Sequence, residues 1–145
     1  MAFSAKAEYA CLAVIDLVQH QAASDGPIQI KDICKRKKIP YKYLTQILPQ
    51  LKSIGIVQSV RGTSGGYLLT RAPEQLTLLE LIEAVDGPLE NHRREKGLAL
   101  MPSDPRSVLS ESWRAAMGRA REELSETTVR DVIDRLKPPP LSYSI

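Results

Sequence analysis

The side chains best suited to specific chemistry in this chain lie along residues 41–54, where the apolar spacing predicts a helix. Gln46 can pair with an adenine edge, Thr45 can bond a base or contact a thymine methyl, and Lys42 can reach guanine or phosphate. Lys52 also lies off the apolar stripe. This set is suited to reading bases in a DNA major groove. The competing interpretation is a solvated polar face, which most exposed helices have.

A second candidate lies in the glycine-rich segment that follows. Arg61 stands at the rise of a predicted hairpin, between two extended apolar runs. The turn contains Gly62, Gly65 and Gly66, which permit the positive φ angles that hairpin turns require and let backbone approach DNA closely. An inserted arginine suits the narrow, electronegative minor groove. Alternatively, the glycines only form the turn; a P-loop fits less well because an extended run follows instead of a helix.

Two short predicted helices present the polar face. Apolar residues repeat at helical spacing over 30–34, Pro40 then breaks the chain, and a second amphipathic pattern runs over 41–54. Two helices joined in this way form a helix-turn-helix, and the hairpin after it forms a wing. Because Pro49 removes the hydrogen bond to the Thr45 carbonyl, we expect a kink or a restart there.

The rest of the chain predicts a mainly α fold with a small β-hairpin wing. Ser4 caps a first helix, a capping box begins at Thr77, Asp104 precedes a long helix, and residues 128–131 cap a last short helix. We expect a winged helix-turn-helix domain over 1–88, a loop over 89–103, a dimerisation helix and a C-terminal helix over 104–137, and a tail over 138–145.

Charge and composition limit the classes of function that this chain can have. Residues 1–71 hold ten Lys/Arg and four Asp/Glu, whereas residues 72–145 hold ten and thirteen. A basic first half suits a polyanionic partner, although two solvated surfaces of different sign are the alternative. No apolar run could span a bilayer, so we expect a cytoplasmic protein with no membrane partner. No paired carboxylates, nucleophile–base set or cofactor fingerprint supports an enzyme.

Cys11 and Cys34 are the only cysteines in the chain. Both lie on apolar stripes of predicted helices, which favours the role of small core residues. Because Lys35 and Arg36 follow Cys34, an exposed Cys34 could instead have a lowered pKa and act as a redox thiol. There is no CxxC motif and no Cys/His cluster, so we expect no zinc site and no cofactor.

Four segments of the chain form a specific pattern. They are Ser4-x-Lys6-x-Glu8-Tyr9-Ala10, Tyr43-Leu44-x-Gln46-Ile47-Leu48, Leu51-Lys52-x-x-Gly55-Ile56-Val57-x-Ser59-Val60-Arg61-Gly62-x-x-Gly65-Gly66-Tyr67-x-Leu69 and Leu78-x-Glu80-Leu81-Ile82-x-Ala84-Val85-Asp86-Gly87-Pro88. This pattern resembles the Rrf-two family of bacterial transcription regulators, which includes IscR, NsrR and CymR. The resemblance covers about residues 1–88 and is weaker in the long helix.

The resemblance implies a winged helix-turn-helix dimer on double-stranded DNA. By position, Tyr43, Thr45, Gln46 and Lys52 would contact the operator and Arg61 the minor groove. Thr45 stands where IscR-type members commonly have glutamate. A glutamate accepts a hydrogen bond from cytosine, whereas a threonine need not. The DNA sequence that this protein recognises should therefore differ from that of IscR-type members.

A second departure concerns the cofactor. Cluster-binding members carry three cysteines in the loop after Gly87-Pro88, but residues 89–102 contain none, which excludes a thiolate-held iron–sulfur cluster there. Glu8 stands where some relatives supply a carboxylate ligand, and His92 lies in the loop; we interpret both as surface or capping residues. The chain is closer here to the CymR type, which is regulated through a protein partner.

The predicted function is therefore a sequence-specific regulator, usually a repressor in this family, that binds a palindromic operator as a homodimer. The long helix supplies the expected dimer interface, although its stripe could pack within one subunit. The stripe contains Leu109, Trp113, Met117, Ala120 and Leu124. Two alternatives remain open: a redox- or metal-responsive sensor with unconventional ligands, and a winged-helix module that binds protein.

Overall fold

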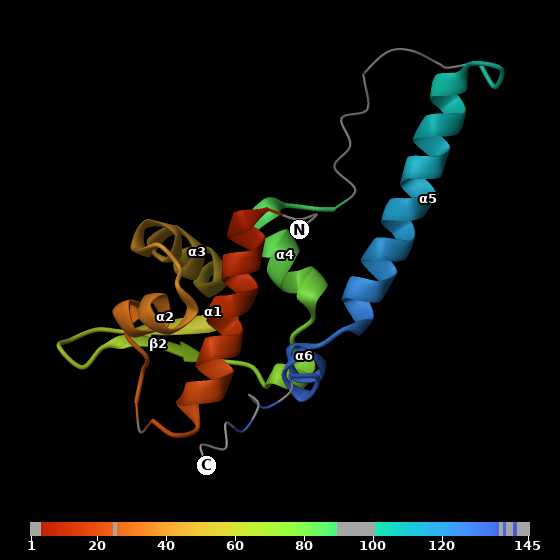
Figure 1. Ribbon diagram of the computed structural model, residues 1–145. Helices are drawn as coiled ribbons and strands as arrows, with labels where there is room; N and C mark the ends of the chain where they lie inside the picture. The colour runs from red at the N-terminus through yellow and green to blue at the C-terminus, as the bar shows by residue number, and fades with distance from the viewer. Residues whose placement is uncertain (1–3, 25, 90–100, 137, 139–140, 142–145) are drawn as a thin grey trace.

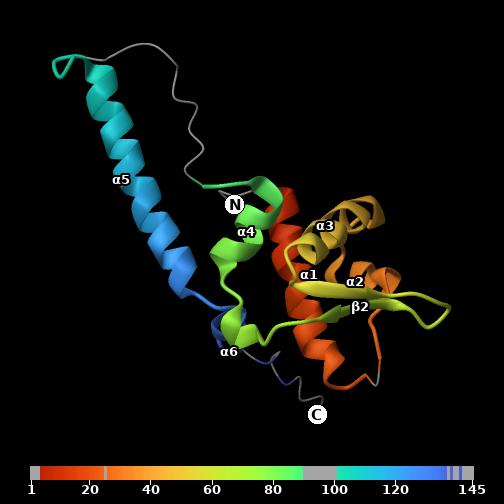
Figure 2. The same ribbon diagram turned by 180° about the vertical axis from the view of Figure 1, so that it is seen from behind.

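The computed structural model describes residues 4–24, 26–89, 101–136, 138 and 141. Figures 1 and 2 show a compact group of helices with a two-stranded hairpin, from which a long helix projects. In chain order the elements are α1 (Ala5–Gln21), α2 (Ile30–Lys37), α3 (Tyr41–Ser53), β1 (Val57–Val60), β2 (Gly66–Leu69), the 3-10 helix η1 (Pro73–Gln75), α4 (Leu78–Asp86), α5 (Pro105–Glu126) and α6 (Val129–Asp134). The expected class, mainly α with a hairpin wing, is confirmed.

Helix α1 forms the centre of the core. Its N-cap is Ser4, whose hydroxyl oxygen accepts a hydrogen bond from the Ala7 amide at 3.0 Å, as the sequence predicts. Helices α2, α3 and α4 pack against α1. The fully buried side chains of this core are aliphatic and include Val14, Leu17, Ile33, Leu44, Ile47, Leu48 and Leu81. This agrees with the low aromatic content of the chain.

The capping residues form the expected bonds, with one difference. Thr128 accepts from the Asp131 amide at 3.1 Å, and the Asp131 carboxylate accepts from the Thr128 amide at 2.9 Å. Hydrogen bonding from Thr128 to this carboxylate, first from its backbone amide, lowers the pKa of Asp131. Thr77 caps α4 in the same way, but the Glu80 carboxylate is paired with Arg71 at 2.6 Å. Glu80 therefore joins α4 to the segment that follows the hairpin.

Helix α6 packs on the winged-helix unit. Val129 is fully buried in its core, and the Val129 amide donates to the Leu76 carbonyl at 2.8 Å. The Leu78 amide donates in turn to the Thr127 carbonyl at 2.9 Å. The expected division grouped α5 and α6 in one part. The structure differs, because an apolar side chain and backbone pairing hold α6 against the N-terminal residues while α5 projects (Figure 2).

Helix α3 runs through Pro49 as one element, so of the two expected alternatives, a kink or a restart, the restart is not found. Proline has no N–H to donate to the Thr45 carbonyl. Both Thr45 and Pro49 are exposed. Water can therefore solvate that carbonyl, which lets the helix continue.

Candidate nucleic-acid interface

A tight turn sets the angle between α2 and α3. Lys38 ends α2 in the left-handed region, with φ 55° and ψ 46°. Ile39 is then buried, and Pro40, in an extended conformation, precedes the first residue of α3. The left-handed residue reverses the chain and the buried isoleucine anchors it. This geometry is the predicted helix-turn-helix.

A partly buried ion pair holds α2 on α1. The Asp16 carboxylate is fully buried and accepts from Arg36 at 2.9 Å (Nε) and 2.7 Å (Nη2). The bond to Asp16 raises the pKa of Arg36. His20 Nδ1 lies 3.5 Å from Asp16 Oδ1, on the same side of α1. A two-bond pair of this kind fixes orientation as well as distance, so α2 is held firmly beneath α3.

The faces of α3 are divided as the sequence predicts. Leu44, Ile47, Leu48 and Leu51 are fully buried. Lys42, Thr45, Gln46 and Lys52 are all exposed. The structure therefore brings these four predicted contact residues together on one exposed side of the helix.

Interactions within the protein already involve Thr45, Lys52 and Tyr43 of the predicted contact set. The Thr45 hydroxyl donates to the Lys42 carbonyl at 2.9 Å, which leaves its oxygen lone pairs and its methyl group for a ligand. Lys52 Nζ donates to Ser59 Oγ at 2.7 Å, which joins α3 to β1. Tyr43 is half-buried, with its ring edge-on to that of Tyr9 at a centroid separation of 5.2 Å. Tyr43 thus joins α3 to α1.

The hairpin has the register of a short wing. Val57 pairs with Leu69, Val60 pairs with Gly66, and Arg61 is exposed in the turn. Gly62 has φ +115° and open space around it, which leaves it accessible to a ligand. Gly65 is buried, and a Cβ there would lie 2.3 Å from the Val60 carbonyl oxygen. Burial favours the turn-forming role of Gly65 over the DNA contact that we expected.

The segment before α2 pairs with the wing, which sequence reasoning missed. The Ile28 amide donates to the Tyr67 carbonyl at 2.9 Å, and the Tyr67 amide donates to the Ile28 carbonyl at 2.8 Å. A Cβ on Gly66, whose φ is +153°, would lie 2.2 Å from the Ile28 carbonyl oxygen. Gly66 therefore permits this close approach, and the only local signals for it in the sequence are the glycines of the hairpin and the isolated Ile28.

The comparisons with known proteins agree with this geometry. The model of the Rrf2 family, described as iron-dependent transcriptional regulators, matches residues 3–135. The chain belongs to the Rrf2 family. An HTH-type transcriptional regulator of Mycobacterium tuberculosis (Rv1287) is 38% identical over 133 residues, which cover 91% of this chain and 81% of that protein. IscR of Photorhabdus laumondii is 31% identical over 134 residues, which cover 92% of this chain and 80% of that protein.

Solved structures of Rrf2 regulators share the fold. CymR, the global cysteine regulator of B. subtilis, superposes with a TM-score of 0.73 and 26% identity, covering 94% of this chain and 99% of that one. IscR of T. potens superposes with a TM-score of 0.72 and 26% sequence identity, covering 96% of this chain and 94% of that one. Like its relatives, this Rrf2 protein is a transcriptional regulator and not an enzyme. Among the described residues, no helix is long and apolar enough to cross a membrane.

The cysteines of this Rrf2 regulator do not form the thiolate set that an iron–sulfur cluster needs. Its two cysteines lie in α1 and α2. Burial and the nearby Glu8 raise the pKa of Cys11 to about 11, and burial raises the pKa of Cys34. A raised pKa is opposite to the direction that a redox thiol at Cys34 needs. Within the described residues, no three His, Cys, Asp or Glu side chains could hold a metal ion; His92 lies outside them.

The predicted dimer stripe of this Rrf2 regulator divides into two parts along α5. Leu109 is 68% exposed and Trp113 is 53% exposed. Met117 and Ala120 are half-buried, and Leu124 packs against the core of its own subunit. Arg121, in the same C-terminal half, lies 3.5 Å from Glu83 of α4. The N-terminal half of α5 therefore presents apolar side chains to solvent, whereas the C-terminal half attaches the helix to α4.

Proposed function

We propose that this Rrf2 regulator binds a palindromic operator as a homodimer and acts as a repressor, with α3 in the major groove and the hairpin in the minor groove. The observation that carries the proposal is that α3 and the wing lie on the same side of the molecule, away from α5 (Figure 1), and that the predicted contact residues of α3 are exposed. Lys42, Thr45 and Gln46 supply donors and acceptors there, and Arg61 supplies a cation at the wing.

Base reading is tested by substitution of Gln46. A duplex is first selected from a random-sequence library by the wild-type protein, and a duplex of unrelated sequence serves as reference. We expect Gln46→Ala to weaken binding to the selected duplex about 10-fold to 100-fold, because a lost bidentate base contact removes that much discrimination. Binding to the unrelated duplex should change little, since phosphate contacts remain. Fluorescence anisotropy measures both dissociation constants.

Two outcomes contradict this assignment. Equal losses on both duplexes would place Gln46 outside the base-reading set, and a wild-type protein that selects no sequence would refute the proposed function. Arg61→Ala tests the wing separately: it should weaken binding to both duplexes, because the wing cation acts on groove potential. Unchanged affinity would remove the wing from the interface.

The homodimer is proposed from the exposed stripe of α5. Leu109 and Trp113 lie on the same side of the helix as Met117 and Ala120. Pairing this stripe with its counterpart would bury apolar area that one subunit leaves in water. A two-fold dimer presents its two recognition helices about one DNA turn apart, ~34 Å, which is why the operator is proposed to be palindromic.

We expect Leu109→Glu to convert the dimer to a monomer at micromolar concentration, measured by sedimentation equilibrium, because two carboxylates would be buried at the two-fold contact. Val108→Glu is the matched control. Val108 is also exposed, at 56%, but it lies about 100° around the helix from Leu109 and off the stripe. A monomeric wild-type protein, or dissociation by both variants alike, would contradict the proposed interface.

A further inference from the structure

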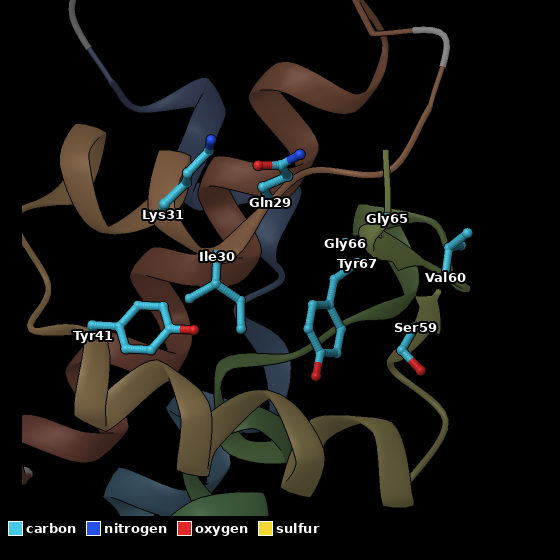
Figure 3. A pocket seen from close by; sticks show the side chains of 9 residues that line it. All are labelled: Gln29, Ile30, Lys31, Tyr41, Ser59, Val60, Gly65, Gly66 and Tyr67. Atoms are coloured by element: carbon cyan, nitrogen blue, oxygen red, sulfur yellow. The ribbon is translucent and has the colours of Figure 1, made fainter. Parts of the chain in front are cut away.

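An open groove separates the start of α2 from the wing (Figure 3). Its walls are the first residues of α2, the first residue of α3 and both strands of the hairpin. Tyr41 is 60% exposed at one edge, Lys31 is exposed at the rim, and Val60 lies on the hairpin side. In Figure 3 the Ile30 side chain lies between the rings of Tyr41 and Tyr67. The lining thus combines hydroxyl groups and an ammonium group with the apolar side chains of Ile30 and Val60.

The groove is held open by backbone pairing between its walls. The two hydrogen bonds between Ile28 and Tyr67 join the segment before α2 to β2. Gln29 Nε2 adds a hydrogen bond to the Thr63 carbonyl in the wing turn, at 3.3 Å. Because these bonds are made within the protein, they hold the two walls in place for a ligand and limit the reorganisation that binding needs.

The position of the groove identifies what it can hold. It lies between the proposed major-groove element, α3, and the proposed minor-groove element, the turn that carries Arg61. A major and a minor groove of duplex DNA are always separated by one sugar–phosphate strand. If α3 and the wing enter adjacent grooves, that strand must cross the protein between them. The groove lies where this strand would cross, between α3 and the wing.

The chemistry of the lining agrees with an anionic strand. None of the described residues that line the groove carries a carboxylate, whereas Lys31 offers a cation and Tyr41, Ser59 and Tyr67 offer hydroxyl donors. Hydroxyl and ammonium donors are those that bind DNA phosphates without reading sequence.

We propose that this groove holds the sugar–phosphate strand between the two DNA grooves, and that Lys31 and Tyr41 are positioning residues that contact its phosphates. The proposal rests on the proposed function. It adds a sequence-independent clamp beside the base-reading residues of α3. Lys31 supplies the salt-dependent part of this contact, and the Tyr41 hydroxyl supplies a neutral hydrogen bond.

The test measures dissociation constants over a range of salt concentrations for the selected and the unrelated duplex. We expect Lys31→Gln to weaken both complexes about equally and to reduce the slope of log K against log salt by about 0.9, the value for one lost phosphate contact. We expect Tyr41→Phe to weaken both complexes about 10-fold to 100-fold with an unchanged slope, because it removes a hydrogen bond to a charged group without removing a charge.

Arg135→Gln is the matched control, since it removes one exposed positive charge from the end of α6, outside the groove. A slope change for Lys31→Gln no larger than for this control would overturn the proposal, as would a loss confined to the selected duplex. Wild-type protein that binds neither duplex would refute the proposed function itself. Wild-type protein that binds while Lys31→Gln and Tyr41→Phe bind equally well would refute only the groove. Circular dichroism confirms that each variant is folded.

Discussion

Gly66→Ala is expected to destabilise the folded state by about 3 to 5 kcal/mol, the sum of a backbone strain and a steric overlap. The added Cβ would lie 2.2 Å from the Ile28 carbonyl oxygen and 2.5 Å from the Ile28 carbonyl carbon. Both atoms belong to backbone that pairs with Tyr67, so they can move only if those hydrogen bonds lengthen. The φ of +153° is also one that alanine rarely adopts. Urea unfolding followed by circular dichroism measures the difference.

Gly62→Ala separates the two causes. Gly62 also has a φ that favours glycine, +115°, but nothing lies within 4 Å of the position of its Cβ. Strain alone should cost about 1 to 2 kcal/mol there. Equal losses in the two variants would show that the contact between β2 and Ile28 does not constrain position 66.

Arg36→Ala is expected to cost about 3 kcal/mol of stability, because it leaves the carboxylate of Asp16 buried without its guanidinium partner. Removal of one member of a buried ion pair costs about 3 to 5 kcal/mol. Asp16 is fully buried, but the Arg36 side chain is 33% exposed, which places the expected loss at the lower end. Thermal unfolding and urea unfolding both measure it.

Lys35→Ala is the matched control in the same helix, since Lys35 is an exposed neighbouring cation. Its loss should change stability by no more than about 0.5 kcal/mol. Arg36→Lys should fall between the two, because lysine keeps the charge but cannot form both hydrogen bonds. If Arg36→Ala cost no more than Lys35→Ala, the ion pair would contribute nothing to the attachment of α2.

The elements of this protein follow from local sequence. The apolar spacing and Ser4 predict α1, and the break at Pro40 predicts the separation of α2 from α3. The exposed position of Gln46 follows from the same spacing, because residues three and four apart share a helix face. Turn-forming glycines between extended runs predict the hairpin. Helix caps, periodicity and turns act within a few residues, so the sequence alone determined them.

The arrangement of these elements depends on contacts between distant residues. In the sequence, Asp16 is only a charged residue in an apolar stretch. In the structure, it is buried against Arg36, twenty positions away. Val129 joins the core through a backbone bond to Leu76.

The groove beside α3 exists because Gly66 lets β2 approach Ile28. The spacing of apolar residues does not predict which strand edge pairs with which segment, since every residue type except proline can form the same backbone hydrogen bonds. The sequence by itself therefore determined the fold class, the family pattern and the polar face of α3. Only the tertiary structure decided how α2, the wing and α6 are attached around it, because those attachments are long-range backbone and ion-pair contacts.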